Sequence, residues 1–327
     1  MILIFMEKHN HLYFIIFTTC LFFFASCNKE KTIQLPWTEL QSPTSLNLNS
    51  IHFTDDSTGH IIGGNIWFED VYLKTTDAGN TWIVDSLRGK EILAMQFNQN
   101  NNGFAVGIGG DFYAKEMPSS NWKYHNLFFP NETFRGVSFW GNEGIIVTGG
   151  AFKGGKIISV DHEFKSELVD SFEQELATVF HTDENIIHVG GYGIMLRSID
   201  GGATWENKGI IGDFFKDIHF PTSQVGYAVG FSGSIIKTTD AGATWNFIRN
   251  GDNLSTSNKP FQSVFFMDEQ NGFIVGDKGI FWRTKNGGEE WEVISDFPEV
   301  DLHDILIINH VGYIVGKNGR IFSFEVV

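Results

Sequence analysis

The sequence predicts an all-β protein, a seven-bladed β-propeller of four-stranded blades. Apolar residues ending in glycine recur about every 41 residues, at Gly63, Gly107, Gly149, Gly190, Gly230, Gly276 and Gly316. Within each interval, short β-branched and aromatic runs alternate with Gly, Asp and Ser turns, and no helical periodicity competes with them after residue 36. Four-stranded repeats of this length are typical of propellers, which protect their strand edges by closing into a ring.

The best-preserved repeat shows all four expected strands. They are Phe215–Phe220, Gly226–Gly230, Ser234–Thr238 and Trp245–Ile248, each short and rich in apolar, β-branched or aromatic residues. Turn residues separate them, as expected for an antiparallel meander.

The last repeat, Leu302–Val327, contains only three strands. Trp37–Leu40 can supply the fourth, so we expect this N-terminal strand to complete the last blade and close the ring. The propeller domain is then predicted to span residues 37–327. This assignment gives every blade an aromatic residue at its fourth strand, where it can wedge between blades: Trp82, Trp122, Phe164, Trp205, Trp245, Trp291 and Trp37.

The first 26 residues are expected to be a signal peptide. Leu12–Ala25 is apolar but shorter than the roughly 20 residues that span a bilayer. It runs into Phe24-Ala25-Ser26-Cys27, which resembles a bacterial lipobox, so Cys27 is the expected lipidation site and residues 27–36 a tether. An ordinary secretory signal with an accidental cysteine remains an alternative. The expected location is the cell envelope, with the chain lipid-anchored to a bacterial membrane.

The composition excludes some classes of function. The chain has 39 acidic and 23 basic residues and a formal charge of −16, which argues against nucleic acid as a partner. Its two cysteines, Cys20 and Cys27, precede the predicted propeller. We therefore expect neither a disulfide nor a cysteine-based metal site there.

An eight-residue motif marks four of the blades: TTDAGNTW, SIDGGATW, TTDAGATW and TKNGGEEW. Its Asp can accept backbone N–H bonds within its own turn, its Gly can adopt positive φ, and its Trp can be buried. Ring geometry places the copies far apart, which favours a structural role over a metal or catalytic one. The predicted structural residues are Asp77, Trp82, Asp200, Trp205, Asp240, Trp245, Asn286 and Trp291.

The motif resembles the Asp-box, or BNR repeat. Gly226–Trp245, with Gly-Tyr-x-Val-Gly followed by Lys-Thr-Thr-Asp-x-Gly-x-Thr-Trp, resembles the photosystem II assembly and stability factor family. The resemblance implies a seven-bladed propeller without enzymatic activity that acts as an assembly chaperone. It also implies an arginine patch for the partner, but the arginines of this chain are scattered among blades, and its acidity points to a different partner.

The expected function is a non-enzymatic scaffold that binds a protein partner, as a monomer, without cofactor or metal, and that meets the membrane only through its lipid anchor. A glycan-active Asp-box protein, either hydrolase or lectin, is the alternative. Sialidases of this type have an Arg-Ile-Pro segment, which this sequence lacks. His52, His219 and His303 recur in first strands, where packed histidines are a better interpretation than metal ligands.

Binding by propellers concentrates on the loops that join second to third strands and each blade to the next, which share one face. Asn250–Lys259 is the longest of these loops. The predicted partner-binding residues are Trp67, Phe68, Glu69 and Asp70, because exposed aromatics flanked by acids are typical of interface hot spots. The alternative is an extended strand pair with Trp67 packed on its neighbour.

Overall fold

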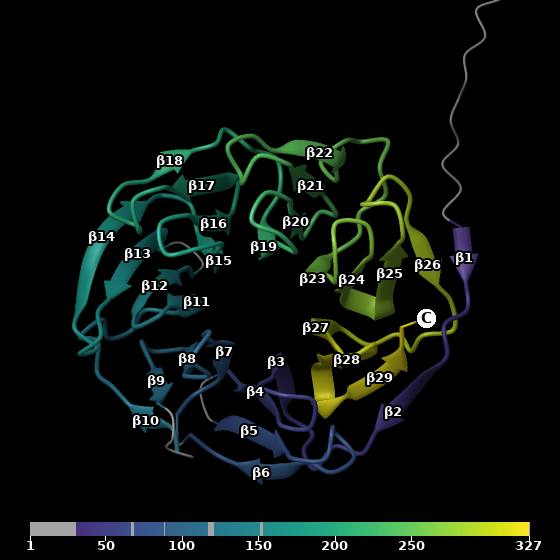
Figure 1. Cartoon of the computed structure of the whole chain (residues 1–327), viewed down its shortest axis with the longest axis horizontal. Coiled ribbons are helices and arrows are strands. Elements are labelled where there is room, and N and C mark those ends of the chain that lie inside the picture. The colour runs from purple at the N-terminus through teal and green to yellow at the C-terminus, as the bar shows by residue number, and fades with distance from the viewer. Residues whose placement is uncertain (1–30, 67–68, 88, 117–120, 151–152, 327) are drawn as a thin grey trace, which may run out of the picture. The chain divides into compact units, whose positions relative to one another are not determined.

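A computed structural model of the chain describes residues 31–66, 69–87, 89–116, 121–150 and 153–326. These residues form seven sheets, each a meander with its first strand innermost, arranged around a central axis (Figure 1). The predicted seven-bladed propeller of four-stranded antiparallel blades is confirmed.

The strands follow the order of the repeats. Blade one holds β3 (Asn47–Phe53), β4 (Gly59–Asn65), β5 (Glu69–Thr75) and β6 (Ile83–Asp85). Blade two holds β7 (Ile92–Phe97), β8 (Gly103–Gly107), β9 (Phe112–Lys115) and β10 (Lys123–Tyr124). Blade three holds β11 (Phe134–Trp140), β12 (Glu143–Thr148), β13 (Gly155–Val160) and β14 (Ser166–Phe172). Blade four holds β15 (Leu176–His181), β16 (Ile187–Gly191), β17 (Ile194–Ser198) and β18 (Glu206–Asn207).

The remaining blades are built in the same way. Blade five holds β19 (Phe215–His219), β20 (Gly226–Gly230), β21 (Ile235–Thr238) and β22 (Asn246–Arg249). Blade six holds β23 (Phe261–Phe266), β24 (Gly272–Gly276), the 3₁₀ turn η1 (Asp277–Gly279), β25 (Ile280–Thr284) and β26 (Glu292–Ile294). Blade seven holds β27 (Leu302–Ile308), β28 (Val311–Gly316), the 3₁₀ turn η2 (Lys317–Gly319) and β29 (Ile321–Glu325).

The recurring glycines are required by close packing. A Cβ on Gly226, which opens β20, would lie 2.5 Å from the Phe220 ring, and a Cβ on Gly272 would lie 2.5 Å from Phe266. The glycine that ends a second strand meets backbone instead, since a Cβ on Gly276 would lie 2.1 Å from the Pro260 carbonyl oxygen. Any side chain at these positions would push adjacent strands apart.

The apolar core lies between blades. Tyr227 of blade five stacks on Phe266 of blade six, with ring centroids 3.5 Å apart. The seven expected wedge aromatics, Trp37, Trp82, Trp122, Phe164, Trp205, Trp245 and Trp291, each pack into a cluster that includes residues of the preceding blade.

The ring closes as predicted. β2 (Trp37–Leu40) pairs antiparallel with β29, with Trp37 opposite Phe324 and Leu40 opposite Ile321. The Trp37 ring also packs on Phe297 at 5.2 Å. The first and last strands of the propeller thus share blade seven, which stabilises the ring against opening.

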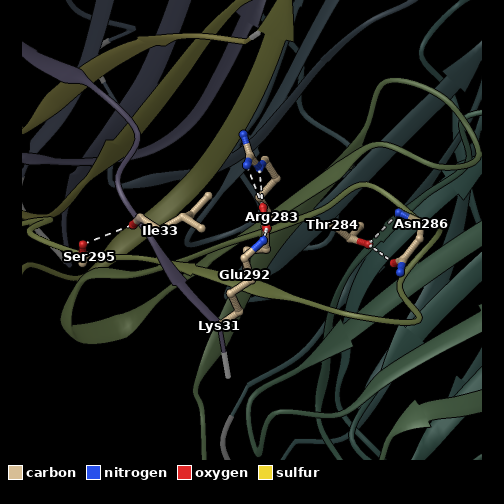
Figure 2. Close-up of polar contacts among 7 residues, drawn as sticks. All are labelled: Lys31, Ile33, Arg283, Thr284, Asn286, Glu292 and Ser295. Carbon is tan, nitrogen blue, oxygen red and sulfur yellow. Dashed lines mark hydrogen bonds and ion pairs between the residues drawn. The ribbon is translucent and has the colours of Figure 1, made fainter. Parts of the chain in front are cut away.

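A further strand precedes this closure, where the sequence predicted only a tether. β1 (Lys31–Ile33) runs parallel to β26 and becomes a fifth strand of blade six. Figure 2 shows two contacts that hold this strand: Lys31 Nζ lies 2.6 Å from a carboxylate oxygen of Glu292, and the Ser295 hydroxyl donates to the Ile33 carbonyl at 3.1 Å. The Ser295 N–H also donates to that carbonyl, at 2.9 Å. Residues 31–33 therefore belong to the folded body. No strand pattern is visible in so short a polar segment.

Candidate functional site

The first strands of all seven blades line a central channel (Figure 1). Its cavity volume is about 670 Å³. Each first strand contributes residues near its start, just after the blade-to-blade loop. The channel wall is therefore lined by seven equivalent short segments, one from each blade. We call the end at which the first strands begin the channel mouth.

Every first strand carries a β-bulge at the same place near this mouth. The pairing with the second strand shifts after Leu48, Ile92, Phe134, Leu176, Phe215, Phe261 and Leu302. A bulge leaves one residue without a partner and re-aims its side chain. The unpaired residues are Asn49, Leu93, Arg135, Ala177, Lys216, Gln262 and His303, and all seven blades contribute this residue to the channel lining. This ring of positions is where the blades differ chemically.

Two buried carboxyl groups meet on one hydroxyl in the channel wall. Ser263 Oγ lies 2.9 Å from Asp217 Oδ2 and 3.0 Å from Asp304 Oδ1. A hydroxyl has one proton, so it donates fully to one carboxylate at a time, and a proton on the other carboxyl would let that group donate to the hydroxyl. Burial, then the neighbouring Asp304 charge, raises the pKa of Asp217 to about 7, and burial also raises the pKa of Asp304. The arrangement therefore favours retention of a proton by this pair towards neutral pH.

The same carboxyl groups connect neighbouring blades. Asp217 of blade five accepts the Val264 N–H of blade six at 2.9 Å, and Asp304 of blade seven accepts the Ile51 N–H of blade one at 2.9 Å. Buried donors satisfied in this way stabilise the ring from its centre.

The predicted histidines also line the channel. The Phe266 N–H donates to His219 Nδ1 at 3.3 Å, His303 Nδ1 donates to the Leu48 carbonyl at 2.9 Å, and His52 stacks on Phe97. Burial lowers the pKa of His52 and of His219 to about 4, so both are neutral at pH 7. Within the described ranges no group of three His, Cys, Asp or Glu side chains could hold a metal ion.

Two cations lie among these groups. Arg135 Nε donates to the Gly149 carbonyl at 2.9 Å, and its Nη2 is 3.8 Å from a Glu175 oxygen. The Lys216 ammonium lies 4.8 Å from the centre of the Phe214 ring. Burial, then the nearby Arg135 charge, lowers the pKa of Lys216 to about 8.

An apolar patch borders this cation on the loop face. We define it as Tyr192, Ile211, Phe214 and Phe231. Tyr192 pairs with Phe214 through the backbone, and the Phe231 N–H donates to the Phe214 carbonyl at 3.0 Å, so loops of blades four and five form one surface. Tyr192, Ile211 and Phe231 are 65%, 71% and 43% exposed.

One buried carboxylate holds this patch in place. Asp213 accepts N–H bonds from Phe214 at 2.6 Å, Ser232 at 2.7 Å and Ser234 at 2.8 Å. It thereby ties the blade-to-blade loop to the second turn of blade five. Exposed apolar side chains on so well-fixed a backbone are typical of a pre-formed binding surface.

Two of the predicted partner-binding residues, Glu69 and Asp70, lie in blade one and not in this patch. Glu69 begins β5 and pairs with Asn65, so the hairpin is extended here. Asp70 is buried and accepts hydrogen bonds from Ser86 Oγ at 2.7 Å and the Leu87 N–H at 2.5 Å, which commits its carboxylate to the fold of the blade. Trp67, Phe68 and the predicted lipidation site Cys27 lie outside the described residues.

The Asp-box residues form one network that recurs. In the third copy, the Asp240 carboxylate accepts the Thr238 hydroxyl at 2.8 Å, the Thr244 N–H at 2.8 Å and the Thr244 hydroxyl at 2.7 Å. The copies around Asp77 and Asp200 repeat these bonds within about 0.1 Å. In the fourth copy Asn286 Oδ1 accepts the Thr284 hydroxyl at 3.0 Å (Figure 2). It also accepts the Glu290 N–H at 3.0 Å. These groups bond within their own turns.

Comparison with known proteins matches this architecture. The family model described as photosynthesis system II assembly factor YCF48 matches residues 210–301, which carry most of the apolar patch, Lys216 and Asp217. The chain resembles the photosystem II assembly factors. The photosystem II assembly lipoprotein Ycf48 of Trichormus variabilis is 27% identical over 179 residues, which is 50% of each chain. The chain thus spans about half the length of the curated relatives it matches.

Solved structures agree on the fold. A structure of YCF48 bound to D1 peptide superposes with a TM-score of 0.71 at 16% identity, covering 91% of this chain and 100% of that one. Virginiamycin B lyase of Staphylococcus aureus gives a TM-score of 0.75 at 10% identity, covering 90% and 100%. At these identities the likeness to YCF48 and to the lyase shows the propeller fold alone.

Sequence reasoning singled out the channel histidines but missed Lys216, the two channel carboxyl groups and the apolar patch. Aligning the seven first strands would have found the carboxyl pair, because Asp217 and Asp304 stand where the other blades have small residues: Ser50, Ala94, Gly136, Thr178 and Ser263. The patch had a weaker signal, since Tyr192 and Phe231 each occupy a turn rich in glycine and serine.

Proposed function

We propose that this chain is a non-enzymatic, lipid-anchored, extracytoplasmic scaffold that binds a protein partner through the apolar patch of blades four and five. The observation that carries the proposal is that three large apolar side chains stand exposed on loops whose backbone is fixed by Asp213. Aromatic and aliphatic anchors of this kind supply most of the binding energy at protein interfaces. The match to the assembly-factor family over residues 210–301 covers most of the same surface.

The anchor belongs to the proposal. Cys27 would carry the lipid, and the Ycf48 relative in Trichormus variabilis is named a lipoprotein, which supports an envelope location. Within the described residues no helix is long and apolar enough to cross a membrane. The propeller would then meet the membrane through the acyl chains attached at residue 27. The anchored propeller would stand on either the periplasmic or the surface face of the membrane.

The partner would be a protein. The solved structure of YCF48 holds a D1 peptide, so a propeller of this shape can present a peptide-binding surface. We infer that this chain acts as a monomer. Its acidic charge of −16 favours a partner different from that of arginine-patched relatives.

The test is capture from native membranes by chemical crosslinking. Ile211→Asp with Phe231→Asp should abolish capture of the partner that the unaltered chain retains, with an unchanged melting temperature. Ile83→Asp with Val84→Asp is the matched control, because these apolar side chains are also exposed but lie on the outer strand of blade one. Equal capture by the patch variant and the unaltered chain would refute the patch as the binding surface.

Trp67 and Phe68 remain a second predicted contact, since the loop that holds them joins second to third strands as the Tyr192 loop does. The same assay tests them. Loss of capture by Trp67→Ala with Phe68→Ala, at unchanged stability, supports the contact, whereas a large loss of stability supports packing against the neighbouring blade.

The glycan-active alternative is tested separately. The scaffold should show neither hydrolysis nor saturable sugar binding in a glycan array and a hydrolysis screen. Saturable binding of one sugar class would replace the scaffold proposal.

A further inference from the structure

Lys216 is a channel cation that lacks a hydrogen-bonded or ion-paired partner among the described residues. Within the part of the chain that the structure describes, its ammonium makes no hydrogen bond and no ion pair, and it lies 4.8 Å from the centre of the Phe214 ring. It lies on the bulge of β19, which turns it into the channel. A partly buried ammonium without a hydrogen-bonding partner is costly, so it is expected where a ligand supplies the partner.

The charged and titratable groups near Lys216 make their contacts with other residues. Arg135 pairs loosely with Glu175 at 3.8 Å, and Asp277 of η1 accepts a hydrogen bond from Gln262 at 2.9 Å. His303 donates its Nδ1 proton to a backbone carbonyl, and burial lowers its pKa, so at neutral pH it adds no charge.

We propose that the channel mouth binds a small oxyanion, a carboxylate or a phosphate, between the Lys216 ammonium and the Arg135 guanidinium. The site lies on bulged residues of blades five and three, both in the lining of one cavity of about 670 Å³. The proposal does not depend on the protein partner, because it concerns the channel and not the patch.

The donor set selects the ligand. Lys216 offers three N–H groups, and Arg135 offers those of its outer nitrogens, of which Nη2 also lies 3.8 Å from Glu175, while its Nε is already bonded to Gly149. Carboxylate and phosphate oxygens accept from both kinds of donor, and charge-assisted bonds of this type are about twice as strong as neutral ones. An apolar molecule would leave the ammonium unsatisfied.

The experiment is a titration of the unaltered chain with sodium acetate and with inorganic phosphate at constant ionic strength, followed by calorimetry and by thermal shift. The two arms decide between a carboxylate and a phosphate. Lys216→Met should weaken binding about tenfold or more, while Lys216→Arg should retain most of it. Lys123→Met is the matched control, since this lysine is exposed on β10 at the outer edge of blade two.

Two results would overturn the site. One is the absence of saturable binding by either anion to the unaltered chain. The other is equal binding by Lys216→Met and Lys123→Met. If Lys216→Met fails to fold, Arg135→Met replaces it, with the same expected loss of binding.

The pH dependence gives a second readout. The charged and titratable groups near Lys216 are Arg135, Glu175, Asp277 and His303, and burial lowers the pKa of His303. Asp217, whose pKa is about 7, also lies in the channel wall, so affinities are compared above pH 8, where its charge changes little. Since the pKa of Lys216 lies at about 8, affinity should fall as pH rises through that value. In Lys216→Arg the fall should vanish, and an equal fall in both proteins would contradict the role of this ammonium.

Discussion

The propeller uses aspartates in two opposite ways. The Asp-box carboxylates of Asp77, Asp200 and Asp240 lie at the surface, and the Thr hydroxyl and backbone donors of their own turns hold the pKa of each below its usual value. Asp217 and Asp304 lie buried in the channel wall, and burial raises the pKa of both. Both groups are fully hydrogen-bonded, yet one stays charged and the other favours retention of a proton towards neutral pH.

The difference follows from where the donors come from. An Asp-box carboxylate finds all its donors within eight residues of sequence, so it recurs wherever the eight residues recur. Asp217 and Asp304 occupy the same repeat position in blades five and seven, and each takes a donor from the next blade, Val264 and Ile51. The Asp-box carboxylates therefore stabilise turns within blades, whereas the channel carboxyl groups connect neighbouring blades.

The largest effect is expected from Asp304→Ala. It leaves the N–H groups of Ile51 and Ile305 without their acceptor in a buried wall and should cost about 2–4 kcal/mol of the free energy of unfolding. Urea denaturation at pH 6 measures it.

The control for this prediction is Asp301→Ala in the loop just before β27. Its carboxylate pairs with Lys317 at 3.0 Å near the surface, so its loss should cost less than about 1 kcal/mol. Similar losses in the two variants would mean that the channel carboxyl is no more important than a surface one.

A pH dependence should separate the two classes of carboxyl next. The pKa of Asp217 is 3.8 in the unfolded reference and about 7 when folded, so the folded state binds the extra proton between those values. This contribution to stability is full below about pH 4 and is lost as pH rises through 7. The pKa of His52 and of His219 moves the other way, to about 4, and removes stability as pH falls below 6.5.

Asp217→Asn removes the contribution of this carboxyl to the pH dependence of stability and keeps that of the histidines. Relative to the unaltered chain, its melting temperature should rise by roughly 3 °C or more between pH 5 and pH 8. Asp240→Asn, in an Asp box whose pKa is lowered to about 2, should show no such trend. If the melting temperatures of Asp217→Asn and the unaltered chain differ by the same amount at every pH, the folded state does not bind an extra proton at Asp217.

The sequence was sufficient for most of the fold and little of the site. Ring closure by Trp37–Leu40 follows from counting strands in the last repeat, and the glycines follow from the repeat itself. β1 could not be predicted, because its pairing with β26 rests on contacts such as Lys31 with Glu292, 261 residues apart. The Asp217–Ser263–Asp304 contact is also between blades, so no single repeat reveals it.

The smallest effect tests whether local donors alone make an Asp box. In the fourth copy Asn286 offers one oxygen, and Glu290 stands where the other copies have a Thr whose hydroxyl reaches the second oxygen. Asn286→Asp with Glu290→Thr restores both partners without changing the net charge, so the melting temperature should rise by about 1–2 °C. Asn286→Asp alone lacks the hydroxyl partner and adds a negative charge, so it should give no rise. A rise of equal size in the single variant would show that the charge, rather than the local donor set, stabilises the turn.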